Sequence, residues 1–142
     1  MVTGQRVKYQ QAIVDNAVVL AAELGKGGLR LVSGGTDNHM LLVDLTRTGI
    51  TGWDAQQALE AVGIVANRNT IPFDPRPPKI ASGLRLGTPA ATSRGLGKEE
   101  MRTIAIWILK VLSHVGDPQV QKQVSEELRQ MCARFPAPGI DR

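Results

Sequence analysis

Two strand-like segments lie so close together in the sequence that they can pair in only one direction. Leu29–Ser33 alternates and is rich in strand formers, and Met40–Leu45 is a largely apolar run. A short polar connection containing glycines, Gly34–His39, joins them. A parallel pair needs a crossover of about a dozen residues or more, so these segments are predicted to form an antiparallel hairpin.

Helical patterns flank this hairpin on both sides. Apolar residues recur at helical spacing between Gln5 and Leu24, and the glycine-rich stretch 25–28 predicts the end of that helix. Thr51 with Asp54 three residues later is typical of a capping box at a helix start. Gly63 predicts the end of this second helix.

The last third of the chain is predicted to be helical. Glu99 and Glu100 open a helix with a wide apolar stripe, formed by Met101, Ile104, Ala105, Ile108, Leu109 and Leu112. Gly116-Asp117-Pro118 interrupts it, with Asp117 placed to cap a final helix and Pro118 at its first position.

The remaining segments complete a small sheet. Ile64–Ala66 and Ser82–Thr88 are predicted strands, and the proline-rich stretch Ile71–Pro78 between them excludes helix and central strand. The expected fold class is α+β, a small, largely antiparallel sheet with helices packed on one face. Residues 1–142 are expected to form a single domain, because the sequence contains no repeat or low-complexity linker.

Composition excludes several function classes. A hydrophobic share of 42% and a charged share of 21% are ordinary for a soluble domain, and no apolar run is long enough for a membrane span. The net charge of +4 is scattered and aromatic residues make up only 4%, which argues against nucleic-acid binding. Cys132 is the single cysteine, which fits a cytoplasmic protein. His39 and His114 lie too far apart to predict a metal site.

Arg85 is the first candidate binding residue. In an extended strand Arg85 shares one face with Gly83 and Gly87, and the two glycines would leave room beside the guanidinium. A guanidinium in such a recess is suited to a carboxylate, which it binds through two parallel hydrogen bonds. The alternative is an internal salt bridge to a residue such as Asp44 or Asp74, and spacing alone does not decide between ligand binding and this salt bridge.

Two further polar segments have structural and functional interpretations. The asparagines of Asn67–Thr70 are suited to contacting a ligand through their amides, but asparagine more often bonds its own backbone in a turn. Ser33–His39 has the composition of a structured hairpin loop. A catalytic role for His39 needs a neighbouring nucleophile or acid, and the sequence identifies none.

Three blocks together carry a resemblance to a known family. They are VSGGTDNHMLLVDL (Val32 to Leu45), GIVANRNTIPFD (Gly63 to Asp74) and SGLRLGTPAATSRG (Ser82 to Gly95), in this order and at fitting distances. They resemble the C-terminal part of serine hydroxymethyltransferase, a pyridoxal-phosphate enzyme that interconverts serine and glycine with tetrahydrofolate as the one-carbon carrier. The resemblance covers nearly the whole chain and weakens after about Val115.

The resemblance implies roles for two residues. Arg85 matches the family arginine that holds the carboxylate of the amino-acid substrate, and Asn69 matches the asparagine that contacts the pterin ring of folate. His39 matches a loop histidine to which no catalytic step is assigned. The family also implies a large cofactor-binding domain as a partner and a homo-oligomer whose subunits share active sites.

The departures from the family pattern set the limits of this inference. Arg68 stands where the family usually has lysine, and Ser93 where it has threonine. The threonine-rich segment ending in His-Lys, which supplies the Schiff-base lysine, does not occur in this sequence. No catalytic or cofactor residue is therefore assigned, no covalent cofactor is expected on this chain, and the isolated chain is expected to be inactive. The alternative is a non-catalytic binding or assembly module derived from the same fold.

Overall fold

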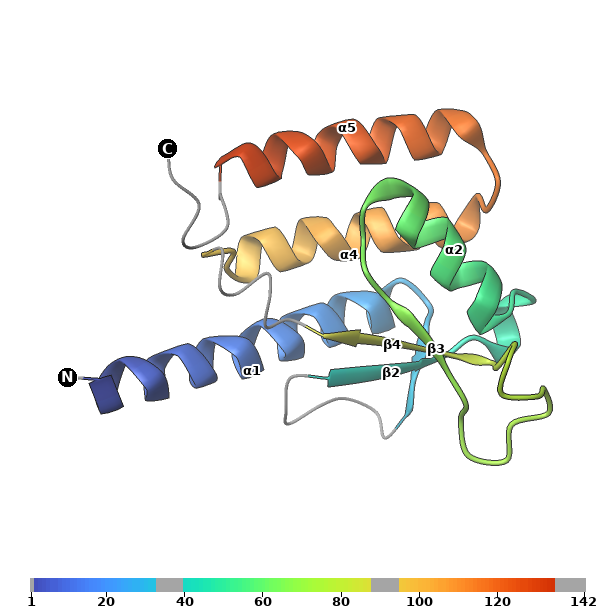
Figure 1. The fold of residues 1–142 in the computed structure, drawn as a ribbon, viewed down its shortest axis with the longest axis horizontal. Coiled ribbons are helices and arrows are strands. Elements are labelled where there is room, and N and C mark those ends of the chain that lie inside the picture. Colours follow the sequence, from blue (N-terminus) through green and yellow to red (C-terminus); the bar gives the residue numbers. More distant parts are fainter. Residues whose placement is uncertain (1, 33–39, 88–94, 135–142) are drawn as a thin grey trace.

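The computed structural model describes residues 2–32, 40–87 and 95–134. Within them, helices pack against a four-stranded sheet (Figure 1). The elements in chain order are α1 (Val2–Lys26), β1 (Arg30–Leu31), β2 (Met40–Asp44), the 3₁₀ turn η2 (Thr46–Thr48), α2 (Gly52–Val62), β3 (Asn67–Asn69), β4 (Gly83–Gly87), α4 (Lys98–Ser113) and α5 (Pro118–Arg134). The predicted α+β class is confirmed.

The sheet is antiparallel throughout, in the order β1-β2-β4-β3. The predicted hairpin is confirmed, because Leu31 of β1 pairs with Val43 of β2. β4 lies in the centre and pairs with β2 over its whole length, whereas β3 adds only three residues at the edge. The edge strand is therefore the more weakly held of β4's two neighbours.

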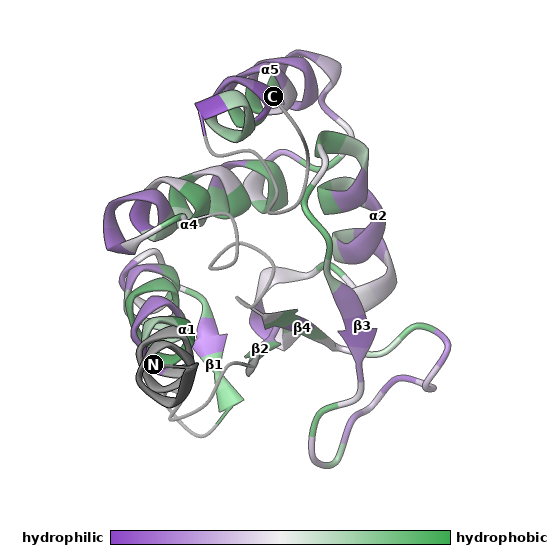
Figure 2. Cartoon of the chain, turned by 60° about the vertical axis from the view of Figure 1, so that its left-hand side comes forward, coloured by the Kyte–Doolittle hydropathy of each residue, from purple (hydrophilic) through white to green (hydrophobic). Residues whose placement is uncertain are grey.

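The helices pack on one face of the sheet. The strand side chains on that face are buried, namely Leu41, Val43, Leu84 and Leu86. They join a core built from the apolar stripes of the helices, with α5 packing outside α2 and α4 (Figure 2). Because side chains alternate along a strand, the residues between them point to the opposite side, called here the outer face.

Three of the predicted helix boundaries are confirmed by their caps. The Thr51 hydroxyl accepts a hydrogen bond of 3.0 Å from the backbone N–H of Asp54, and Gly63 ends α2 with a φ of 96°. Asp117 accepts a 2.9 Å bond from the backbone N–H of Gln119 at the start of α5. No helix in the described ranges is both long and apolar enough to cross a membrane.

The prediction of a strand at Ile64–Ala66 is wrong. The backbone N–H of Ile64 bonds to Leu59 O at 2.9 Å, so this residue still belongs to the end of α2. Val65 is 83% exposed, and pairing begins only at Asn67. The apolar pattern suggested the strand, but tertiary contacts decided its position.

The polar strand β3 is anchored to α2 through its middle residue. The backbone N–H of Arg68 donates to Gln56 Oε1 at 2.8 Å, and the guanidinium donates to the same oxygen at 3.3 Å. The guanidinium also stacks 4.6 Å from the centre of the Trp53 ring. These contacts hold Arg68 on the helix side of the sheet, which turns Asn67 and Asn69 to the outer face.

Candidate functional site on the outer face of the sheet

Arg85 lies at the centre of the outer face. The sheet register places it directly between Leu42 of β2 and Asn67 of β3. Its side chain is exposed. Within the described ranges it forms no salt bridge. The guanidinium is thus positioned by a central strand with its donors turned away from the core.

The two aspartates considered as internal partners of Arg85 are engaged elsewhere. Asp44 lies 3.3 Å from the Arg30 guanidinium. Asp74 accepts a 2.7 Å hydrogen bond from the Ser82 hydroxyl and further bonds from backbone N–H groups. The internal salt bridge that the sequence left open does not form with either residue. This outcome favours the ligand-binding alternative for Arg85.

Asn69 lies on the same face as Arg85. It pairs with Gly83, two residues along β4 from Arg85, so Asn69 and Arg85 are diagonal neighbours about 7–8 Å apart. Its Nδ2 donates to the carbonyl of Thr70 at 2.9 Å, which is the local backbone bond that asparagine commonly makes. An amide carries two donors and an acceptor oxygen, so this bond leaves further capacity for a ligand.

Gly83 is required by packing within the chain. A Cβ at this position would lie 2.5 Å from the backbone oxygen of Asn69 and 2.8 Å from the Cγ2 of Ile71. It would also lie 3.1 Å from a methyl group of Leu42. The recess expected on this side of Arg85 is therefore filled by the chain's own side chains, and the neighbouring β3 approaches closely.

The loop between β3 and β4 is held by the carboxylate of Asp74. Its Oδ2 accepts from the backbone N–H groups of Ile71 at 3.2 Å and Ser82 at 2.9 Å. Its Oδ1 accepts from the backbone N–H of Arg76 at 2.8 Å and from the Ser82 hydroxyl. Burial raises the pKa of Asp74, but these hydrogen bonds outweigh it and lower the pKa to about 2.

The sequence interpretation missed this arrangement. It considered Asp74 only as a partner for Arg85, and it assigned Ser82 only to a strand. An aspartate between prolines in a loop is a signal for side-chain to backbone bonding. The residues that the carboxylate reaches, however, lie up to eight positions away, and only the fold shows that they meet.

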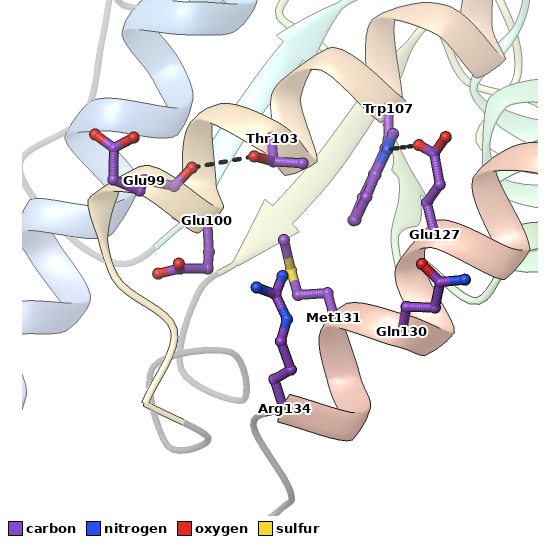
Figure 3. A pocket seen from close by; sticks show the side chains of 8 residues that line it. All are labelled: Glu99, Glu100, Thr103, Trp107, Glu127, Gln130, Met131 and Arg134. Atoms are coloured by element: carbon purple, nitrogen blue, oxygen red, sulfur yellow. Dashed lines mark hydrogen bonds between the residues drawn. The ribbon is translucent and has the colours of Figure 1, made fainter.

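A separate hollow of about 530 Å³ lies between α4 and α5 (Figure 3). Its residues come from the two helices and are Glu99, Glu100, Thr103, Trp107, Glu127, Gln130, Met131 and Arg134. Several are already bonded within the protein: Trp107 Nε1 donates to Glu127 at 2.7 Å, and Glu100 accepts from the N–H of Gly97. Neither Arg85 nor Asn69 lines it, so this hollow is distinct from the outer face.

Some sequence-based candidates cannot be placed. His39 and the Thr88–Arg94 part of the third block lie outside the described residues. No group of three or more histidine, cysteine or acidic side chains in the described ranges is arranged to hold a metal ion. The candidate site consists of Arg85 and Asn69 on the outer face, with Asp74 in the loop that joins their strands.

Comparisons with known proteins agree with the resemblance. A family model described as serine hydroxymethyltransferase matches residues 2–108. A serine hydroxymethyltransferase from Dehalococcoides mccartyi is 53% identical over 136 residues, which are 95% of this chain and 33% of that protein. The one from Acidothermus cellulolyticus is 53% identical over 140 residues, 94% of this chain and 33% of that protein. The chain spans about a third of the length of these curated relatives.

Proposed function

The chain belongs to the serine hydroxymethyltransferase family, and we propose that it forms the C-terminal part of a pyridoxal-phosphate-dependent serine/glycine hydroxymethyltransferase. The complete enzyme would convert serine and tetrahydrofolate to glycine and methylenetetrahydrofolate. The observation that carries the proposal is the position of Arg85, exposed on the outer face of a central strand while Asp44 and Asp74 have other partners.

Arg85 is proposed to bind the carboxylate of the amino-acid substrate. A guanidinium offers parallel donors that match the two oxygens of a carboxylate. β4 supports this role because its pairing with β2 on one side and β3 on the other fixes the strand direction. Arg85 would then orient the substrate relative to the reacting centre without itself taking part in bond breaking.

Asn69 is proposed to contact the pterin ring of the folate. The ring carries an amide-like edge of donors and acceptors, and a carboxamide side chain can complement both kinds of group. Its place on the outer face beside Arg85 supports a shared site in which both substrates approach the same surface.

Pyridoxal phosphate would supply electron withdrawal from the substrate in the complete enzyme. The described part of this chain does not fit covalent attachment of that cofactor at the outer face, because no strand residue of the sheet is a lysine. The portion of the enzyme that accounts for the remaining two-thirds of the relatives' length is the proposed source of the cofactor site.

The proposal includes the state of the protein in solution. The 142-residue chain by itself is expected to be inactive, and its main partner is the large cofactor-binding domain. A homo-oligomer with shared active sites and a cytoplasmic location are further parts of the proposal. The alternative, a non-catalytic binding or assembly module, predicts loss of Arg85 or of the Asn67–Thr70 block, and both are present.

The test combines this chain with the complementary N-terminal portion of the Dehalococcoides mccartyi relative, in the presence of pyridoxal phosphate. Glycine-dependent change in the visible absorbance of the cofactor and serine cleavage are expected only when both parts are present. Activity from this chain alone would contradict the proposed division of the site, and no activity from the combination would favour the assembly module.

A substitution tests the role of Arg85 in the same mixture. Arg85→Lys keeps the charge but loses the paired geometry, so KM for serine should rise by about 10- to 100-fold. Arg129→Ala, which removes an exposed arginine on α5, is the matched control and should leave KM unchanged. An unchanged KM in Arg85→Lys would contradict carboxylate binding by this residue.

A further inference from the structure

The loop between β3 and β4 is long for the strand pairing that it closes. β3 and β4 share only three residue pairs, and residues 70–82 lie between them. Closing a loop of this length has an entropic cost, and a short ladder offers few hydrogen bonds to offset it. A slip of one residue would also turn every β3 side chain to the other face. The contacts of Arg68 with Gln56 hold the middle of β3, so the end of the strand beyond Arg68 needs a support of its own.

The carboxylate of Asp74 lies at the point where such a support is needed. Its Oδ2 bridges the N–H of Ile71, two residues after Asn69, and the N–H of Ser82, directly before Gly83. Because Asn69 and Gly83 form the last pair of the ladder, the carboxylate continues the ladder by one further link.

The second oxygen of Asp74 secures the loop itself. Oδ1 accepts from the N–H of Arg76 and from the fully buried hydroxyl of Ser82. The guanidinium of Arg76 donates to the same hydroxyl at 3.0 Å. The far side of the loop is independently attached to α2, where the N–H groups of Gly52 and Trp53 donate to the carbonyls of Ala81 and Ile80, both at 2.9 Å.

We propose that Asp74 is a positioning residue that holds the end of β3 in register and so keeps Asn69 on the outer face beside Arg85. The inference rests on the proposed function of Asn69. Asp74 should affect the positions of Asn69 and Arg85 unequally. Arg85 lies in the central strand and is also fixed by β2, whereas Asn69 is the last residue of an edge strand. The four hydrogen bonds that the Asp74 carboxylate accepts are called here the Asp74 clasp. Loss of the clasp should therefore displace Asn69 more than Arg85.

The first measurement is amide hydrogen exchange on the 142-residue chain. In Asp74→Asn, an NH2 group replaces one acceptor oxygen, so a side-chain donor faces a backbone N–H donor. The N–H groups of Ile71, Arg76 and Ser82 should therefore exchange at least tenfold faster. The amides of β1 and β2 should keep their protection. Ser82→Ala removes one of the four bonds and should give a smaller change at the same amides. Unchanged protection at these amides in Asp74→Asn would overturn the clasp.

The second measurement is steady-state kinetics of the assembled enzyme. Asp74→Asn should raise KM for tetrahydrofolate at least tenfold, change KM for serine by less than about threefold and leave kcat nearly unchanged. Asp117→Asn is the matched control, because Asp117 also accepts backbone N–H bonds but caps α5, away from the outer face. Equal changes in both KM values, or the same pattern in Asp117→Asn, would overturn the positioning role.

A third variant separates this inference from the function on which it rests. Asn69→Ala should raise KM for tetrahydrofolate directly. If it does and Asp74→Asn does not, the positioning role is wrong. If Asn69→Ala has no effect on that KM while the exchange result holds, the folate assignment fails and the clasp at the base of the loop stands.

Discussion

The two hairpins of the sheet are each fastened by one aspartate, and the two carboxylates do this in different ways. Asp44, at the end of β2, faces the Arg30 guanidinium, which is 62% exposed, and accepts bonds from the hydroxyl and N–H of Thr46. Asp74 has no cationic partner among its hydrogen bonds, and all four of its donors are backbone N–H groups or a buried hydroxyl.

The difference shows where each hairpin gets its rigidity. In the β1–β2 hairpin the aspartate supplements a strand, β2, that is already paired along its length with β4. In the β3–β4 hairpin the aspartate closes a long loop behind a three-residue ladder. The Asp44 carboxylate is itself buried, but its donors belong to the exposed residues Arg30 and Thr46, which water can solvate. Two of the four donors of Asp74 belong to the fully buried Ser82, which depends on this acceptor. The loop carrying Asn69 should therefore depend more on its aspartate.

The largest loss of unfolding free energy is expected from adding a Cβ at Gly83. Gly83→Ala would place a Cβ 2.5 Å from the Asn69 backbone oxygen, and backbone cannot move aside as a flexible side chain can. A loss of about 3 kcal/mol in unfolding free energy is expected, measured by urea denaturation. Gly25→Ala, whose Cβ meets nothing within 4 Å, is the control and should not destabilise. Equal midpoints for both variants would contradict the close approach of β3.

Removing the carboxylates of Asp74 and Asp44 in turn should lower the unfolding free energy by unequal amounts. Asp74→Ala leaves the donors of Ser82 and Ile71 without their acceptor and should cost about 2–3 kcal/mol. Asp44→Ala should cost about 1 kcal/mol, because its donors belong to the exposed residues Arg30 and Thr46 and can be solvated instead. Thermal or urea unfolding of the two variants makes the comparison. A larger loss of unfolding free energy in Asp44→Ala would mean that the β1–β2 hairpin depends more on its aspartate than the β3–β4 hairpin does.

The lowered pKa of Asp74 should also make the stability of the fold depend on pH. The pKa of Asp74 is lowered from 3.8 to about 2, so its ionised form stabilises the fold above about pH 4. That contribution, at most about 2 kcal/mol, is lost as the pH falls through about 2. Asp74→Asn should therefore flatten the stability profile between about pH 4 and 2. The variant and the original protein showing the same slope there would contradict the lowered pKa.

The smallest effect is expected at Arg30. Arg30→Ala removes a mostly exposed partner and should change the unfolding free energy by about 0.5 kcal/mol or less. The difference between Arg30→Ala and the original protein should shrink further as salt is raised, because exposed charges are screened. Asp74→Asn should show no comparable salt dependence. A large, salt-independent loss of unfolding free energy in Arg30→Ala would contradict the proposed difference between the Asp44 ion pair and the hydrogen bonds of Asp74.

Much of the fold could be predicted from local signals. The short connection between β1 and β2 required an antiparallel pair, and Thr51, Gly63 and Asp117 marked helix ends where the structure has them. These signals work because caps and tight connections depend on residues a few positions apart. The strand around Arg85 was found for the same reason, since Leu84 and Leu86 alternate with it and are both buried.

The exact position of β3 and the purpose of Gly83 could not be predicted in this way. Ile64–Ala66 has a stronger strand pattern than the polar Asn67–Asn69. Ile64 is nevertheless bonded to the C-terminal end of α2, and Gln56 of α2 holds Arg68 in the edge strand. Gly83 was interpreted as leaving room for a ligand beside Arg85. The structure shows that the neighbouring β3 and Ile71 occupy that room.

The sequence by itself determined the α+β class, the direction of the first hairpin, most helix ends and the family resemblance that singled out Arg85 and Asn69. Only the tertiary structure decided that both residues share one face and that Asp74 reaches across the loop between their strands. The physical reason is the separation in sequence of the residues that interact. Periodicity and capping involve neighbours in the chain, whereas register and the partners of a carboxylate are set by segments that meet only after the sheet and helices have packed.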